Sequence, residues 1–134
     1  MTPETAHQIL DDMFAPWVRA LDLRIDSLCC SGATLSMPVT PEIARVGGIV
    51  SGQAIAALAD TAMVFACAGH FKEFKPVATT NLDLQFLRPG AGERISCRAL
   101  VVRAGSKVVF TRAEIVAKPS EKDVATATAT YMVP

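Results

Sequence analysis

The stretch GGIVSGQAIAALADTAMVFACAGH, residues 47–70, decides the fold of this chain. It begins with two glycines, continues as an alanine-rich apolar run of strong helix formers, and reaches Gly69, a residue type that often ends helices. The pattern predicts one helix over residues 47–70. Because apolar side chains cover almost every face of that helix, we expect it to be buried nearly all round.

Asp60 is the only formally charged residue in this predicted helix. A carboxylate inside a buried helix costs free energy unless it has a partner or a function. From the residues alone, a structural acid bonded to backbone groups and a catalytic acid are about equally good explanations. The same charge, together with Ser51, Gly52 and Gln53 near the start, argues against a membrane span, although the apolar run is long enough for one.

The length and composition predict a single domain that covers residues 1–134. Thirteen basic and thirteen acidic residues give a formal net charge of zero, so no overall field favours nucleic acid or an anionic membrane. Hydrophobic residues make up 51% of the chain, a high share that predicts apolar surface hidden in an oligomer interface or a ligand channel. The expected partners are therefore a small molecule and further copies of the chain.

The N-terminus and the cysteines favour a cytoplasmic protein. The first residues show no basic segment followed by an apolar one, so we expect no secretory signal. Cys29, Cys30, Cys67 and Cys97 have neither the spacing of a disulfide framework nor that of a zinc site, which predicts reduced thiols. With two histidines and no ligand spacing, we expect no metal and no separate cofactor.

The rest of the chain reads as one short helix and six strands. Pro3–Trp17 has apolar residues at helical spacing, with Thr2 or Thr5 as the candidate N-cap. Strand-like runs cover residues 18–30, 33–39, 77–87, 94–103, 107–118 and 123–132, and alternating alanines give the last run one small face. The late connections are too short for parallel crossovers. The predicted class is therefore α+β, with an antiparallel sheet curled around the one buried helix.

Three motifs occur together along the chain. Ser51-Gly52-Gln53 is followed after four residues by Leu58-Ala59-Asp60, residues 78–89 read ATTNLDLQFLRP, and a Gly-Ser-Lys hairpin at 105–107 precedes the closing Ala/Thr strand. This combination resembles the hotdog-fold acyl-CoA thioesterases, in the branch of the phenylacetate-pathway thioesterases within the 4-hydroxybenzoyl-CoA thioesterase superfamily. The resemblance implies a curved antiparallel sheet around one central helix, an acyl-CoA substrate, and a homodimer that pairs into a dimer of dimers.

The resemblance also implies roles for several residues. The backbone N–H of Gly52 would polarise the thioester carbonyl. Asp60 of the partner chain would activate water as a general base or attack as a nucleophile, and we favour the general base. Thr79 stands where relatives carry a serine that positions the water, with Thr80 and Asn81 as weaker candidates.

The predicted helix gives an independent reason for two chains. Gly52 falls in its first turn, where backbone N–H groups are unpaired and the helix dipole favours negative charge. Asp60 comes eight residues later, roughly 12 Å along the axis at the usual rise per residue. One carbonyl cannot touch both groups, so their cooperation requires a second chain related by a two-fold axis.

The chain departs from the better-known family pattern at three positions. Ser51 stands where many relatives have histidine, Gln53 where they have a second glycine, and Arg45 where they often have an amide. Arg45 either replaces that amide or binds a phosphate. The candidate catalytic residues are thus Asp60, Gly52, Thr79 and Ser51, and the candidate substrate or coenzyme A contacts are Arg45, Gln53, Thr80, Asn81, Arg88, Arg103 and Lys107.

Simpler structural explanations also remain for several of these candidate residues. Ser51 fits an N-cap better than a nucleophile because no Gly-x-Ser-x-Gly elbow surrounds it, and the arginines and lysine are ordinary surface residues. Two other functions remain: a non-catalytic acyl-CoA sensor or carrier, and a hydratase or dehydratase, which would need a histidine beside the acid. The apolar residues expected to line an acyl pocket are Phe14, Trp17, Met63, Phe65 and Phe71.

Overall fold

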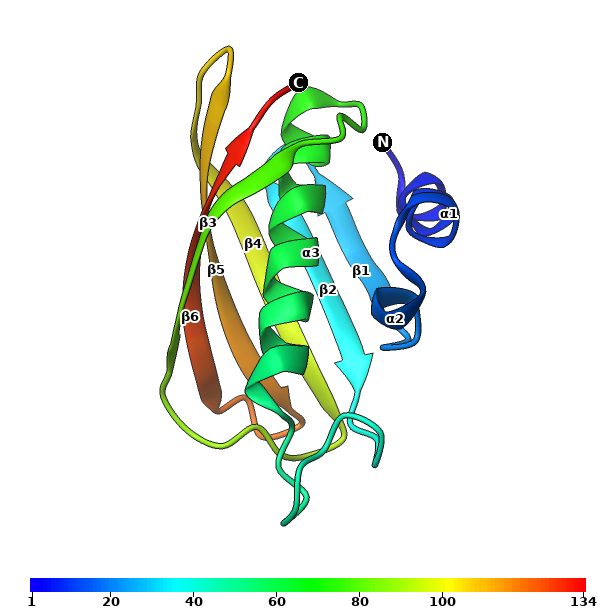
Figure 1. Cartoon of the computed structure of the whole chain (residues 1–134), viewed down its shortest axis with the longest axis vertical. Coiled ribbons are helices and arrows are strands. Elements are labelled where there is room, and N and C mark those ends of the chain that lie inside the picture. The colour runs from blue at the N-terminus through cyan, green and yellow to red at the C-terminus, as the bar shows by residue number, and fades with distance from the viewer.

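One antiparallel sheet wraps around one long helix (Figure 1). The computed structural model describes all residues from 1 to 134. The strands pair in the order β1-β2-β4-β5-β6-β3, and every pair is antiparallel. The strands are β1 (Arg24–Cys29), β2 (Gly32–Pro38), β3 (Ala78–Phe86), β4 (Arg94–Ala104), β5 (Val108–Lys118) and β6 (Asp123–Met132), and the helices are α1 (Pro3–Met13), α2 (Pro16–Arg19) and α3 (Gly52–Phe71). The predicted class and architecture are confirmed.

Alternation along the strands gives the sheet an apolar inner face and a polar outer one. In β5, Val109, Ala113 and Ile115 are buried toward the helix, whereas Arg112 and Glu114 between them are exposed. The small alanine face predicted for β6 is likewise buried. The helix nevertheless packs mainly across β2 and β4 rather than β6.

The central helix begins later than predicted. Gly47 and Gly48 have φ of 100° and 77°, left-handed values that do not occur inside an α-helix. Ser51 is the N-cap of α3, because its hydroxyl accepts a hydrogen bond from the Ala54 N–H at 3.2 Å. The predicted start at residue 47 is therefore wrong: the two glycines form the preceding turn, and the helix starts at Gly52.

The other end of α3 also differs from the prediction. Gly69 does not end the helix, which continues to Phe71 and is closed by Lys72 in the left-handed conformation, with φ of 61°. A Cβ atom at Gly69 would overlap the carbonyl oxygen of Cys29 at the end of β1. Glycine is needed there because the helix backbone lies directly against the strand.

The predicted burial of α3 is confirmed except along one stripe. Gln53 is exposed, and Ala57, Asp60 and Val64 are partly exposed on the same helical face. By length and composition alone, α3 could span a membrane. However, 72% of an 18-residue apolar stretch within it is buried inside the protein, as expected of a core helix. Apart from its two ends, α3 can meet a substrate or another chain only along this stripe.

The N-terminal segment forms two helices instead of the predicted one. Ala15 has an extended backbone, the conformation favoured before a proline, and Pro16 starts α2. The predicted strand over residues 18–30 is also shorter in the structure, because α2 includes residues up to Arg19 and β1 starts only at Arg24. Of the two residues predicted as the N-cap of α1, Thr2 and Thr5, the structure shows Thr2 in that position.

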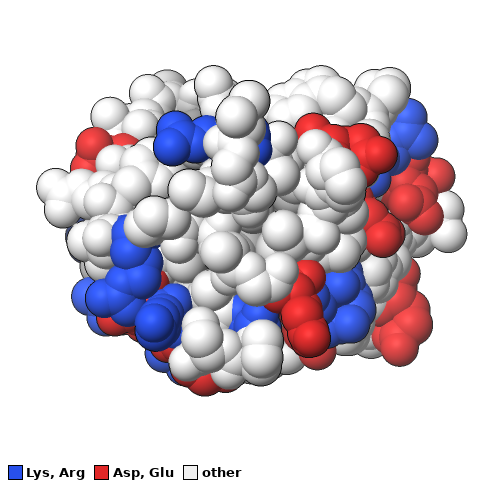
Figure 2. Space-filling view, turned by 90° about the horizontal axis from the view of Figure 1, so that it is seen from below, with Lys and Arg blue, Asp and Glu red and all other residues white.

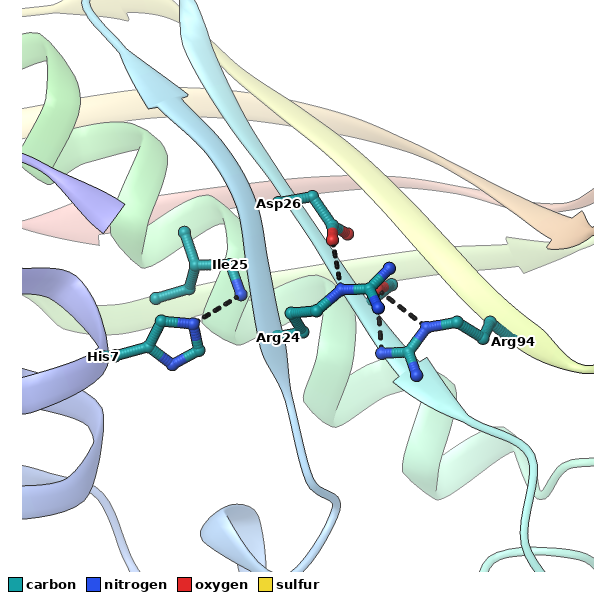
Figure 3. A network of polar contacts seen from close by, with 6 residues as sticks. His7, Arg24, Ile25, Asp26 and Arg94 are labelled. Atoms are coloured by element: carbon teal, nitrogen blue, oxygen red, sulfur yellow. Dashed lines mark hydrogen bonds and ion pairs between the residues drawn. The ribbon is translucent and has the colours of Figure 1, made fainter. Parts of the chain in front are cut away.

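Helix α1 is fastened to the β1 edge of the sheet. The imidazole Nε2 of His7 accepts a hydrogen bond from the backbone N–H of Ile25 at 3.2 Å (Figure 3). On the neighbouring strands, the guanidinium of Arg94 donates two hydrogen bonds to the Ser36 hydroxyl, at 3.0 and 3.1 Å. The first contact uses an N–H that an edge strand would otherwise offer to solvent.

Strand β3 forms the opposite edge and has no covering element. It pairs with β6 alone, and all its residues except Leu84 are exposed. Its inward-facing side chains include Leu82, which is 36% exposed, and Phe86, which is 52% exposed. This long strand, with its apolar inner face, is therefore unpartnered on its outer edge.

Candidate active site

The Asp60 carboxylate lies at the meeting point of α3, β3 and β6. Its Oδ1 atom accepts a hydrogen bond from the Tyr131 hydroxyl at 2.7 Å and another from the Thr79 hydroxyl at 3.0 Å. The Tyr131 hydroxyl also lies 3.0 Å from the backbone oxygen of Asp60. These bonds to one oxygen, together with the partial exposure of Asp60, explain how the charge is tolerated on an otherwise apolar helix.

Tyr131 is the residue that sequence reasoning missed. It is completely buried, and burial raises the pKa of its phenol far above the ordinary value, with the Asp60 charge and hydrogen bond acting in the same direction. The phenol therefore stays protonated and acts as a donor. A signal was present, because this single tyrosine of the chain interrupts the alternating alanines of the last strand.

A small apolar pocket opens beside the Asp60 carboxylate. Its volume is about 120 Å³, and α2 and the linker between α1 and α2 form the wall opposite α3. The lining residues are Phe14, Trp17, Val18, Ala57, Asp60, Thr61 and Val64. An apolar surface around one carboxylate suits a substrate with a hydrocarbon part next to a reacting polar group.

The helix N-terminus borders a different pocket. Helix α3 begins at the lower end of the molecule in Figure 1. The cavity at this end has a volume of about 270 Å³ and is lined by Arg45, Ile49, Val50, Gly52, Ile55, Phe86, Arg88, Pro89 and Gly90. Gly52 is the first residue of α3, so its N–H is one of the donors that the helix leaves unpaired. The two arginines and the helix dipole make this pocket suitable for negative charge.

The surrounding end of the molecule is not basic as a whole. Figure 2 shows patches of both signs separated by uncharged surface. The preference for an anion is therefore local to the pocket at Gly52 and does not extend over this face.

The remaining polar candidates are spread over α3 and the sheet. Gln53 and Asn81 are exposed, and the Thr80 hydroxyl donates to the Thr130 carbonyl at 3.1 Å. Arg103 and Lys107 lie at the β4–β5 hairpin, at the opposite end of the sheet from the pocket at Gly52. Within one chain, Arg45 and Arg88 share a pocket with Gly52, and Arg103 and Lys107 do not.

The predicted acyl-pocket residues separate into two groups. Phe14 and Trp17 line the pocket at Asp60, as expected. Met63 and Phe65 are completely buried in the core, where Phe65 stacks on Phe14 at a ring distance of 5.5 Å, and Phe71 lies at the end of α3. The assignment of Met63 and Phe65 is wrong, because the sequence of a helix that is apolar on every face does not reveal which side is open, and the assignment of Phe71 stays a prediction.

Other nucleophiles and bases do not reach the carboxylate. Burial raises the pKa of the Cys67 and Cys97 thiols to about 12. The Cys29 pKa is lowered by the Ser31 hydroxyl, but this thiol is exposed at the β1–β2 hairpin. Neither histidine is hydrogen-bonded to Asp60, so the pairing that a hydratase would need is absent from this chain.

The two parts of the predicted site thus lie in separate pockets of one chain. Asp60 accepts hydrogen bonds from two hydroxyl groups beside an apolar pocket. Gly52 presents the N-terminus of α3 to a second pocket that is suited to negative charge. The arrangement can polarise a carbonyl at one pocket and hold a carboxylate base at the other.

Comparison with known proteins identifies the class of fold. The chain superposes on the thioesterase HI1161 of Haemophilus influenzae with a TM-score of 0.88, at 22% identity, covering 100% of this chain and 91% of that one. It superposes on the PaaI protein from the phenylacetic acid degradation operon of Escherichia coli with a TM-score of 0.84, at 24% identity, covering 98% and 91%. The hotdog fold implied by the sequence motifs is confirmed.

Sequence comparison then gives the family. The family described as the Thioesterase superfamily matches residues 47–124, more than half of the chain. The medium/long-chain acyl-CoA thioesterase YigI of E. coli strain K12 is 29% identical over 151 aligned positions, covering 99% of this chain and 97% of that protein. The chain belongs to the thioesterase superfamily, and the predicted enzyme class, a thioester hydrolase, is confirmed.

Proposed function

We propose that the protein is a homodimeric acyl-CoA thioesterase that releases a free acid and coenzyme A at two sites, each shared between two chains. The observation that carries the proposal is the separation of Gly52 and Asp60 into different pockets of one chain. The name of the E. coli relative supports a medium- or long-chain acyl group, and the apolar pocket at Asp60 is compatible with a hydrocarbon.

The bare β3 edge is the surface that we assign to the second chain. Two copies of β3 that pair antiparallel across a two-fold axis would continue the sheet from one chain into the next. The same axis would set the two α3 helices antiparallel, which brings the Gly52 end of one toward Asp60 of the other. Exposed Leu82 and Phe86 would be covered in this dimer. Its pairing into a dimer of dimers remains a further expectation.

The proposed reaction uses a simple division of roles. The Gly52 N–H donates to the thioester oxygen and stabilises the negative charge that develops there. The partner's carboxylate at position 60 takes a proton from water, whose oxygen attacks the carbonyl carbon. The carbon–sulfur bond then breaks, and the proton that the carboxylate took from water passes to the coenzyme A thiolate as it leaves. Arg45 and Arg88 line the same pocket as Gly52 and would add positive charge near the developing oxyanion.

The direct test replaces the proposed base. Asp60→Asn keeps the shape of the side chain and removes its basicity, so we expect release of free thiol from a panel of acyl-CoA substrates to fall at least about 1,000-fold. Asp123→Asn is the matched control, because Asp123 is an exposed acid at the start of β6, and its activity should equal that of the wild type. The oligomeric state of both variants is checked by light scattering.

The outcomes separate enzyme from sensor. Full turnover by Asp60→Asn contradicts the assigned base. Tight binding of acyl-CoA by the wild type without any thiol release, over all chain lengths and aryl substrates, would favour a non-catalytic acyl-CoA-binding protein instead.

A further inference from the structure

The two oxygens of the Asp60 carboxylate are unequal. Oδ1 accepts both hydroxyl hydrogen bonds, from Tyr131 and Thr79, whereas Oδ2 accepts none from the protein. An oxygen that already accepts two hydrogen bonds is a poorer base than one with open lone pairs. Only Oδ2 is left to accept a hydrogen bond from water.

The register of the sheet brings the two donors together. Thr79 on β3 and Tyr131 on β6 are directly opposite each other in the antiparallel pair, so their side chains lie on the same face, toward α3. Tyr131 also pairs with Val109 on β5 and is completely buried. The phenol therefore has little freedom to move, and its hydroxyl occupies a fixed place below the helix.

The second contact of the phenol fixes the helix itself. Besides Oδ1, the Tyr131 hydroxyl meets the backbone oxygen of Asp60 at 3.0 Å. One hydroxyl thus touches both the main chain and the side chain of the same residue, which restricts the side-chain rotation of Asp60.

We infer that Tyr131 is a positioning residue of the thioesterase reaction, which together with Thr79 holds Oδ1 and thereby presents Oδ2 to the attacking water. The inference rests on the proposed role of Asp60 as the base. Tyr131 takes no proton itself, because its hydroxyl is a buried donor.

The test compares Tyr131→Phe with a matched loss of another buried hydroxyl. Thr111 lies on the inner face of β5 and donates to the Ala129 carbonyl at 2.9 Å without touching Asp60, so Thr111→Val is the control. Loss of a hydrogen bond to a charged group should lower kcat of Tyr131→Phe about 10- to 100-fold, with KM changed less than about twofold. Thr111→Val should keep the wild-type kcat.

The pH–rate profile distinguishes positioning from simple support of the fold. A donor to the carboxylate favours its ionised form, so removal of the donor should move the acidic limb of the Tyr131→Phe profile to higher pH. The acidic limb of Thr111→Val should not move. Thr79→Val should give a smaller shift in the same direction, and Thr79→Ser should restore the wild-type profile. These Thr79 variants also test the inference if Tyr131→Phe folds poorly.

Two results would overturn the inference. One is a Tyr131→Phe enzyme with wild-type kcat and an unmoved acidic limb while Asp60→Asn is inactive, which leaves the proposed function intact. The other is an equal loss of kcat in Tyr131→Phe and Thr111→Val with neither profile shifted, which means that the phenol only supports the fold. Full activity of Asp60→Asn removes the proposed function and this inference together.

Discussion

The two edges of the sheet differ in how their free backbone groups are used. At β1, helix α1 lies along the edge, and His7 accepts the N–H of Ile25. At β3, no element covers the strand, and its apolar side chains Leu82 and Phe86 are partly exposed. One edge is closed within the chain, whereas the other is available to a second copy, and this open edge is also the side on which Asp60 meets Thr79.

The strongest test of this comparison asks whether the open edge completes the site. Gly52→Pro removes the backbone N–H at a position where the fold accepts proline, because proline is common as the first helix residue and Ser51 already has φ of −64° and ψ of 146°. Both Gly52→Pro and Asp60→Asn homodimers should be nearly inactive. A heterodimer of the two, purified through two different tags, should recover about half of the wild-type activity, because one of its two sites is intact.

The control for this experiment is Gly52→Ala, which adds a Cβ atom but keeps the N–H. That Cβ would lie 3.4 Å from the Phe86 ring, an ordinary contact, so most activity should remain. A heterodimer without activity would mean that Gly52 and Asp60 of the same chain serve the same site.

The second prediction disrupts the open edge itself. Leu82→Lys places a charge on the inward side of β3, where the proposed dimer covers it, so we expect dissociation to monomers and loss of most thioesterase activity. Analytical ultracentrifugation and thiol release measure the two effects. Val102→Lys, on an exposed residue of β4 away from this edge, should leave both unchanged. A fully active monomer would contradict the shared site.

The third prediction concerns the close contact at the covered edge. Gly69→Ala forces a Cβ atom onto the Cys29 carbonyl, so the free energy of unfolding should fall by about 1–3 kcal/mol. Urea unfolding at a fixed protein concentration measures this loss. Gly105→Ala at the β4–β5 turn, where the nearest atom is 3.4 Å away, should change stability far less. Equal losses would show that the approach of α3 to β1 is not tight.

The smallest expected effect belongs to the bond that closes the β1 edge. His7→Ala leaves the Ile25 N–H without its partner and should cost about 1 kcal/mol of unfolding free energy, with the dimer unchanged. Gln8→Ala removes an exposed bond to Asp12 on the same helix and should cost less, at most about 0.5 kcal/mol. Thermal unfolding curves compare the two. A new tendency to form larger assemblies in His7→Ala would mean that this edge, too, can recruit another chain.

Local sequence patterns predicted the elements well because helix and strand periods are local properties. The strand over residues 123–132 agrees with β6, and the hydrophobic run around Asp60 is the central helix. The start of that helix was misplaced because glycine permits both a helix and a left-handed turn, and only the structure shows that Gly47 and Gly48 adopt the turn.

Contacts between residues far apart in the sequence limited how much of the site could be predicted. The spacing of Gly52 and Asp60 follows from one helix and could be read directly from the sequence. The contact between Tyr131 and Asp60 joins residues that are 71 positions apart, and it depends on how α3 packs over β6, which no local pattern specifies. The same limit explains why Phe65 was assigned to the pocket although it lies in the core.

The single helix between Gly52 and Asp60 also constrains how the gene can change in length. One inserted or deleted residue between these positions would turn the carboxylate by about 100° and shift it by about 1.5 Å, away from Tyr131 and Thr79. A change of length between residues 52 and 60 should therefore impair the site even when every side chain of the site is kept.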